Sequence, residues 1–262
     1  MKGKRPGKNG NYCQSIMWEN RVMIIIPDVH GRRFWIKPVK EHLGKEHIVF
    51  LGDYLDPYRD ENIPEEVVFS RFQDILTLKK NHPNDITLLL GNHDLHYLSS
   101  HIEGGRFDVV NSERNKRMFT ENISLFQLAY EAKVGGVKYL FTHAGILWGW
   151  IISHNELFGK IKPNKISSKL NELWRSEESK DELYKALGDI PLSRWGRYLY
   201  GSPVWSDVDD MDVNNAELPG FFQVFGHTQQ EYRPIINDFF ACLDCRRAFQ
   251  LTESGDFIKL DF

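Results

Sequence analysis

Short apolar runs of four or five residues recur along the chain. They lie at residues 22–26, 48–51, 86–90, 137–141, 221–225 and 239–243. Runs of this length are typical of strands, and runs without polar residues are typical of strands that are buried on both faces. The pattern therefore predicts six buried strands.

The segment between the second and third runs has a helical period instead. Val68, Phe72 and Ile75 share one face of a helix, and Pro64 suits the start of a helix over residues 64–81. A strand, a helix and a further strand in this order favour a largely parallel sheet covered by helices. Ligands of such sheets bind beyond the carboxyl ends of the strands, so we expect functional residues directly after each run.

The middle of the chain has another pattern. Leu173 and Trp174 stand among many charged residues at the spacing of an amphipathic helix, which predicts a helical insertion at about 151–200. No internal repeat or strong linker appears, so we expect a single domain over residues 21–262. Residues 1–20 are rich in Lys, Arg and Gly, and they predict a flexible N-terminal arm.

Composition narrows the class of protein. Of the 262 residues, 41% are apolar and 26% are charged, and the formal net charge of −3 argues against a nonspecific nucleic-acid binder. No apolar run approaches the roughly 18 residues that suggest a membrane span. The three cysteines give no disulfide framework. We therefore expect a soluble, cytoplasmic protein with neither a nucleic-acid nor a membrane partner.

Polar residues follow five of the six runs. They are Asp28, His30, Asp53, Asn92, His93, Asp94, His143 and His227. Taken alone, each is more often a helix cap or a hydrogen-bonded structural residue than a ligand. Together at one edge they indicate a metal site, because imidazole and carboxylate donors suit Mn²⁺, Fe²⁺ and Zn²⁺. Two such ions activate a water molecule and clamp phosphoryl oxygens, so phosphate chemistry is the expected use.

These clusters resemble, in this order, those of the calcineurin-like metallophosphoesterase superfamily over roughly residues 24–251. The resemblance implies an α/β fold of the layered α+β type. In that fold helices flank a central β-sandwich, and a dimetal site lies at the carboxyl ends of the strands. It changes the expectation from one open sheet to two packed sheets, and it does not extend to the helical middle.

The resemblance also implies a set of metal ligands. Asp28 and His30 would bind the first ion, and Asp53 would bridge both ions. The two ions would be Mn²⁺, with Fe or Zn as alternatives. The other ligands of the second ion would be Asn92, His143 and His227.

A proton donor and a phosphate-binding residue follow from the same resemblance. His93 would protonate the leaving oxygen and Asp94 would orient its ring, although Asp94 could instead be a helix cap. Protein phosphatases typically carry a phosphate-gripping arginine where this chain has Pro57. Arg59 is the nearest substitute, and a solvated loop residue is the alternative interpretation.

Two details favour the phosphoprotein phosphatase branch. Gln229 stands where many superfamily members have a further histidine, and Trp205, Ser206 and Asp207 resemble a short stretch of that branch. The leading hypothesis is therefore a Ser/Thr protein phosphatase-like enzyme that uses metal-activated water on phosphate esters. Its partner would be a phosphorylated protein.

Two alternatives remain open. The run from residue 91 to His96 resembles symmetrical diadenosine tetraphosphate hydrolases, in which a second histidine follows at the same distance, so a nucleotide or another small phosphate ester is the rival substrate. A catalytically silent binding module is the alternative from another class. The sequence does not indicate the oligomeric state.

Overall fold

Each of the six apolar runs forms a strand in the computed structural model, which describes residues 22–213 and 218–261. The predicted N-terminal arm, residues 1–20, lies outside the described residues. The six strands are β1 (Met23–Ile26), β2 (His47–Phe50), β3 (Ile86–Leu89), β6 (Val137–Phe141), β7 (Phe222–Phe225) and β9 (Phe240–Cys242).

The strands form two sheets. One has six strands in the order β11-β10-β1-β2-β3-β4, and the other has five in the order β5-β6-β7-β9-β8. Strands β1 to β4 are parallel to one another, as are β6, β7 and β9. The layered α/β fold is thereby confirmed, whereas the single open sheet that periodicity alone predicts is wrong. The strands that the apolar runs do not include are β4 (Phe126–Gln127), β5 (Tyr130–Val134), β8 (Ile235–Ile236), β10 (Ala248–Leu251) and β11 (Phe257–Leu260).

Two apolar cores explain why the central strands are mostly apolar. In β1, Met23 and Ile25 point into the core that includes residues of both sheets, and Ile24 and Ile26 point into the core that includes the helices. Successive side chains of a strand point to opposite faces, so a strand between two cores is apolar throughout.

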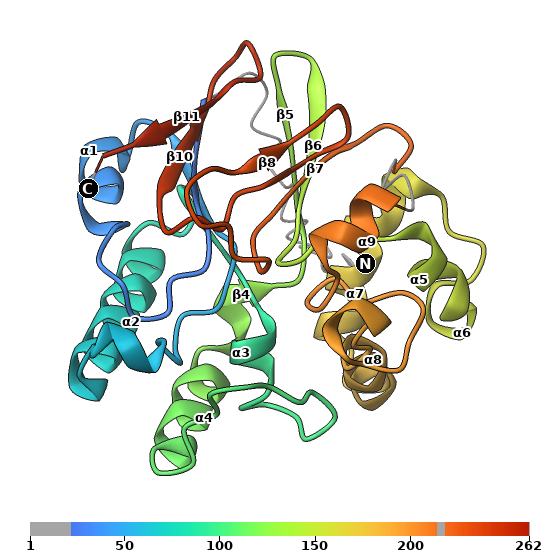
Figure 1. Ribbon diagram of the computed structural model, residues 1–262, viewed down its shortest axis with the longest axis horizontal. Helices are drawn as coiled ribbons and strands as arrows, with labels where there is room; N and C mark the ends of the chain where they lie inside the picture. Colours follow the sequence, from blue (N-terminus) through green and yellow to red (C-terminus); the bar gives the residue numbers. More distant parts are fainter. Residues whose placement is uncertain (1–21, 214–217, 262) are drawn as a thin grey trace, which may run out of the picture.

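Helices cover the outer face of the six-stranded sheet (Figure 1). The predicted helix forms as α2 (Glu65–Asn81), with Pro64 as its N-cap residue and Val68, Phe72 and Ile75 buried. The remaining helical elements of this half of the chain are α1 (Ile36–His42), η1 (Arg59–Glu61), α3 (Asn92–Leu95), α4 (Ser112–Glu121) and η2 (Ile123–Leu125).

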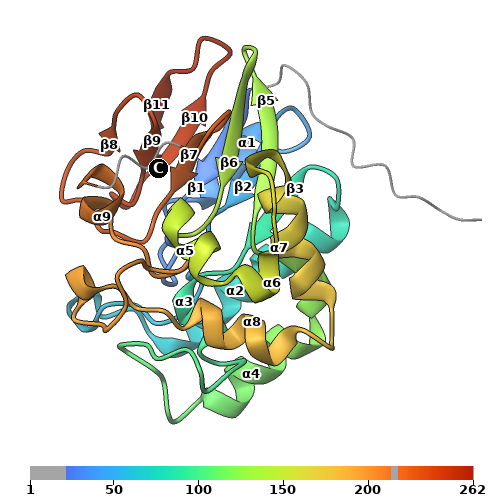
Figure 2. The ribbon, with the colours of Figure 1, turned by 90° about the vertical axis from the view of Figure 1, so that its right-hand side faces the viewer.

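The helical middle lies beside the five-stranded sheet, on the right in Figure 1 and facing the viewer in Figure 2. Leu173 and Trp174 are buried there, as their amphipathic spacing predicts. No helix in the described part of the chain is both long and apolar enough to span a membrane. The helical elements of this region are α5 (Trp148–Ser153), α6 (Asn155–Phe158), η3 (Pro163–Lys165), α7 (Ile166–Arg175), α8 (Lys180–Leu187), η4 (Leu192–Arg194) and α9 (Val208–Val213).

Candidate active site

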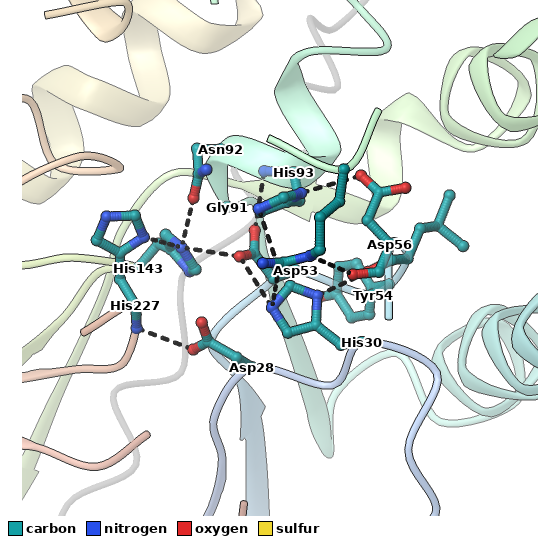
Figure 3. A network of polar contacts seen from close by, with 12 residues as sticks. Asp28, His30, Asp53, Tyr54, Asp56, Gly91, Asn92, His93, His143 and His227 are labelled. Carbon is teal, nitrogen blue, oxygen red and sulfur yellow. Dashed lines mark hydrogen bonds and ion pairs between the residues drawn. The ribbon is translucent and has the colours of Figure 1, made fainter. Parts of the chain in front are cut away.

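The six predicted metal ligands meet where the carboxyl ends of both sheets converge (Figure 3). The six-stranded sheet contributes the residues that follow β1, β2 and β3, and the five-stranded sheet contributes those that follow β6 and β7. All except the partly exposed His227 are buried. The residues are Asp28, His30, Asp53, Asn92, His143 and His227.

Two glycines allow the carboxylates to lie against the backbone. A Cβ atom on Gly91 would overlap Asp53 Oδ1, and a Cβ atom on Gly226 would overlap Asp28 Oδ1. These are the glycines that precede Asn92 and His227 in the sequence. The absence of a side chain at both positions is therefore a requirement of the site itself, because any side chain would displace a carboxylate.

Asp53 lies at the centre of the ligand set. Its Oδ2 atom is 3.5 Å from the Nε2 atoms of both His30 and His143. His143 Nε2 is also 3.1 Å from Asn92 Oδ1 and 3.1 Å from His227 Nδ1. Two groups whose ligand atoms lie within 4.8 Å of one another share this carboxylate: Asp28, His30 and Asp53, and Asp53, His143 and His227.

The histidines are oriented as metal-binding histidines require. His30 Nδ1 lies 2.7 Å from the carbonyl oxygen of Leu55, and His143 Nδ1 lies 2.9 Å from that of Leu51. A carbonyl oxygen is an acceptor, so Nδ1 carries the hydrogen and the lone pair of Nε2 in the neutral ring is the one that could bind a cation. His227 Nε2 is buried and has no hydrogen-bond partner among the described residues. The ring turns its other nitrogen, Nδ1, toward His143 Nε2, and imidazoles grouped within 4.8 Å of the Asp53 carboxylate are donors that fit a divalent ion.

The pKa shifts of the three histidines differ in direction. Burial lowers the pKa of His30 and of His227 well below the usual value, so both are neutral donors. Burial acts in the same direction on His143, but the charges of Asp53 and Asp28 outweigh it and raise its pKa to about 10. Burial raises the pKa of Asp53, yet the neighbouring His143 and His93 hold it well below its usual value. A cation at this site would replace a proton on His143.

Asp56, rather than Asp94, contacts the ring of His93. Asp56 Oδ2 lies 3.0 Å from His93 Nδ1. Burial raises the pKa of Asp56, but hydrogen bonds from His93 and His96 outweigh it and lower the value. Asp56 follows Asp53 by three residues in the loop after β2, and it meets His93 only through the fold.

The carboxylate of Asp94 is hydrogen-bonded to the backbone. It accepts hydrogen bonds from the backbone N–H groups of Gly91, Asp53 and Tyr54, at 2.8, 2.8 and 2.9 Å. It therefore caps α3 and ties the loop after β2 to the loop after β3. Its burial and the charge of Asp53 raise its pKa well above the usual value. This geometry corresponds to the helix-cap alternative and not to the orientation of His93.

Arg106, a residue without a sequence motif, reaches the site from the loop before α4. Its Nη2 atom is 3.2 Å from the Nε2 atoms of both His30 and His93, and its Nε donates to the carbonyl oxygen of Asp56. Arg59 is exposed, and no hydrogen bond joins its side chain to a predicted ligand within the described residues. Only the fold brings Arg106 here, so the sequence alone gave no signal beyond its two preceding glycines.

A second arginine lies on the opposite side. Arg194 pairs with Asp207 at 2.8 Å, and its Nη2 donates to Thr228 Oγ1, next to His227, at 2.8 Å. Trp205 packs edge-on against the His227 ring. The Trp205 to Asp207 stretch, noted in the sequence, therefore borders the site.

A comparison with protein families now identifies the fold family. The model of the calcineurin-like phosphoesterases matches residues 22–231. The chain belongs to the calcineurin-like phosphoesterase family. The phosphoesterase is thus a dimetal hydrolase of phosphoester bonds, with Asp and His groups in its structure that could bind metal. No curated protein matches the sequence.

Solved structures show the same fold. A protein-tyrosine phosphatase from a psychrophilic Shewanella species is 17% identical with a TM-score of 0.52, covering 92% of this chain and 81% of that one. A Ser/Thr phosphatase from Saccharomyces cerevisiae is 15% identical with a TM-score of 0.54, covering 94% and 80%. At these identities the similarity establishes the fold of the phosphoesterase and no substrate.

Proposed function

We propose that the phosphoesterase is a Mn²⁺-dependent phosphomonoesterase that acts on phosphoserine and phosphothreonine in cytoplasmic proteins. The observation that carries the proposal is the pair of ligand groups that share Asp53, with His93 directly beside them. Fe and Zn are the alternative ions, because the same donors suit them.

Two groups of side chains would hold the metal ions from opposite sides of one carboxylate. Asp28 and His30 form one side of the site, His143 and His227 form the other, and Asp53 lies between them. Divalent ions bound there would supply the positive charge that stabilises phosphoryl oxygens and favours ionisation of a water molecule.

His93 is the proposed proton donor. With Nδ1 bonded to Asp56, its Nε2 faces the space beside His30 and Arg106. As the bond between phosphorus and the leaving oxygen breaks, its electron pair stays on that oxygen, which takes the proton from Nε2. The carboxylate of Asp56 accepts a hydrogen bond from Nδ1 and fixes the orientation of the ring.

The two arginines that border the site are the proposed phosphate contacts. Arg106 lies beside His30 and His93, and Arg194 lies beside His227, so an anion at the site would have a guanidinium on either side. Charge-assisted hydrogen bonds from Arg to phosphate are strong. The geometry favours Arg106 over the predicted Arg59 for this role.

A groove next to the site supports a polypeptide substrate. Cavities of about 830 and 570 Å³ both have Ser100, His101 and Glu103 in their walls, so they adjoin. Their charged lining residues are nearly balanced, which suits a polypeptide better than a polyphosphate chain. The positively charged lining residues are Lys116, Lys185, Arg194 and Arg197, and the negatively charged ones are Glu103, Glu113 and Asp181.

A substrate panel tests the proposal. Protein reconstituted with Mn²⁺ should hydrolyse phosphoserine and phosphothreonine peptides with a kcat/KM at least about tenfold above that for diadenosine tetraphosphate. Asp53→Asn should reduce turnover to background, and His93→Asn should lower kcat by roughly 10² to 10⁴. Asp74→Asn, on the exposed side of α2, is the matched control.

Each outcome separates the candidates. Faster release of two ADP molecules from diadenosine tetraphosphate would establish the rival dinucleotide hydrolase. Preference for phosphotyrosine would reject the Ser/Thr assignment alone. Unchanged turnover in both Asp53→Asn and His93→Asn would reject the site itself, and an absence of both metal uptake and turnover would indicate a binding module.

A further inference from the structure

His96, the residue that resembles the second histidine of dinucleotide hydrolases, contacts Asp56. It caps the C-terminal end of α3, three residues after His93, so both imidazoles lie on the same side of the helix. His96 Nε2 is 2.8 Å from Asp56 Oδ2, the same oxygen that lies 3.0 Å from His93 Nδ1. The other oxygen, Oδ1, accepts a hydrogen bond of 2.5 Å from the hydroxyl of Tyr97.

The packing around His96 fixes its ring. The rings of Tyr97 and Phe107 meet it edge-on at centroid distances of 4.4 and 4.9 Å. A Cβ atom on Gly104 would overlap its Nδ1, so the loop before Arg106 closes tightly over the ring. Among the described residues neither ring nitrogen has a partner with hydrogen-bond geometry, so the 2.8 Å approach of Nε2 to Asp56 Oδ2 is an ion-pair contact and the nearest polar contact of the ring. The carboxylate of Asp56 is therefore the polar group toward which His96 is held.

His96 is poorly placed to recognise a substrate. Only 7% of its surface is exposed, where one edge of the ring reaches the wall of the groove. Its ring packs edge-on against that of His93 at a centroid distance of 5.3 Å, and its contact with the carboxylate uses the nitrogen that could otherwise bind a phosphate. The likeness to nucleotide hydrolases at this position therefore does not require a nucleotide.

We propose that His96 is a positioning residue for leaving-group protonation. It holds Oδ2 of Asp56 so that the carboxylate keeps the His93 ring in place, with Nε2 directed at the leaving oxygen. This inference rests on the proposed function, in which His93 is the proton donor. Its distinctive consequence is that the loss caused by removing His96 must depend on the leaving group, because only poor leaving groups need the proton.

The test uses a series of aryl phosphates with leaving groups of increasing pKa, and a phosphoserine peptide as the poorest. His96→Leu should lower kcat on the order of tenfold or more for the peptide and phenyl phosphate, as expected for one lost contact to a charged group. The loss should be less than about threefold for 4-nitrophenyl phosphate, with KM nearly unchanged. His96→Gln, which keeps an N–H donor, should recover most of the activity.

Two controls accompany the series. His82→Leu, at the C-cap of α2 and before β3, at the opposite end of that strand from the site, should leave every rate unchanged. The thermal midpoint of His96→Leu should remain high enough for the protein to be folded during the assay.

The other outcomes overturn the inference and leave the proposed function intact. An equal loss of kcat for all leaving groups would show that His96 only supports the fold. A rise in KM confined to peptides or nucleotides would show that it binds substrate. An anomalous difference map with a metal ion between Asp56, His93 and His96 would show that these side chains bind metal and that His96 does not position His93. A wild-type protein without turnover would instead reject the proposed function.

Discussion

Five residues around the candidate site hold backbone conformations that residues other than glycine rarely adopt. His30, Asp53, Asp56, Arg106 and His227 have φ between 44° and 64°. Such conformations cost on the order of 1–3 kcal/mol each and persist only where the surrounding structure enforces them. Their clustering around one pocket indicates that the fold tolerates strain there in order to direct these side chains toward one another.

This cluster includes the residue on which phosphate affinity should depend. Arg106→Ala should weaken inhibition of aryl phosphate hydrolysis by inorganic phosphate roughly 10- to 100-fold, because a charge-assisted contact is lost. Arg59→Ala, in the same cavity wall, is the matched control and should change the inhibition constant less than about twofold. A larger effect of Arg59→Ala would instead identify Arg59 as the phosphate-binding residue, as the sequence predicts.

The sequence predicts residues that follow strands better than residues that meet across the fold. The six predicted metal ligands stand directly after apolar runs, so strand topology alone brings them to one edge. The contact between Asp56 and His93 joins residues 37 apart, and Arg106 meets His30 across 76 residues. No local pattern encodes such a pairing, and so the structure was needed to replace Asp94 by Asp56 at the His93 ring.

At the scale of elements, burial decides which strands a sequence reveals. The central strands β1 and β2 are apolar, apart from His47 at the start of β2, because both of their faces are covered. Strand β5 carries Glu131 and Lys133 between buried residues, since it lies at the edge of its sheet. Strands β4 and β8 have only two residues each, too few for any periodicity.

One element carries a buried histidine that should make stability depend on pH. His47 is the first residue of β2. Its Nε2 is hydrogen-bonded to Thr87 Oγ1 in β3, and its ring stacks on Tyr130 in the other sheet. Burial lowers its pKa to about 4, with a smaller effect from Lys79. The unfolded chain binds a proton below the ordinary value of about 6.5, whereas the folded chain does so only near 4. Stability is therefore lost as the pH falls from 6.5 toward 4.

Replacement of this histidine measures the effect. Between pH 7 and pH 5, His47→Gln should lose roughly 1–2 kcal/mol less free energy of unfolding than the wild type, as measured by urea denaturation. His82→Gln, which removes a more exposed histidine, is the control. Identical pH dependence in the wild type and His47→Gln would show that His47 titrates in the folded state as it does in the unfolded chain.

At the scale of the whole molecule, the candidate site is a junction between the two sheets. Asp28, His30 and Asp53 follow strands of one sheet, and His143 and His227 follow strands of the other. Between the sheets the contacts are apolar, with residues such as Ile25 and Phe141 in one core. Ions that bind both sets of ligands would therefore connect the sheets at one end of that core.

Metal binding should for this reason stabilise the entire domain. Ions at about 100 times their dissociation constant contribute about 2.7 kcal/mol if only the folded chain binds them, which raises Tm by roughly 5–10 °C for a chain of this size. Differential scanning calorimetry of EDTA-treated protein, with and without Mn²⁺, measures the shift. Asp53→Asn should abolish most of it, because this carboxylate belongs to both ligand groups, whereas His47→Gln should retain it. An equal shift in Asp53→Asn would mean that the stabilising ion binds elsewhere, and the dimetal site would then lack its central ligand.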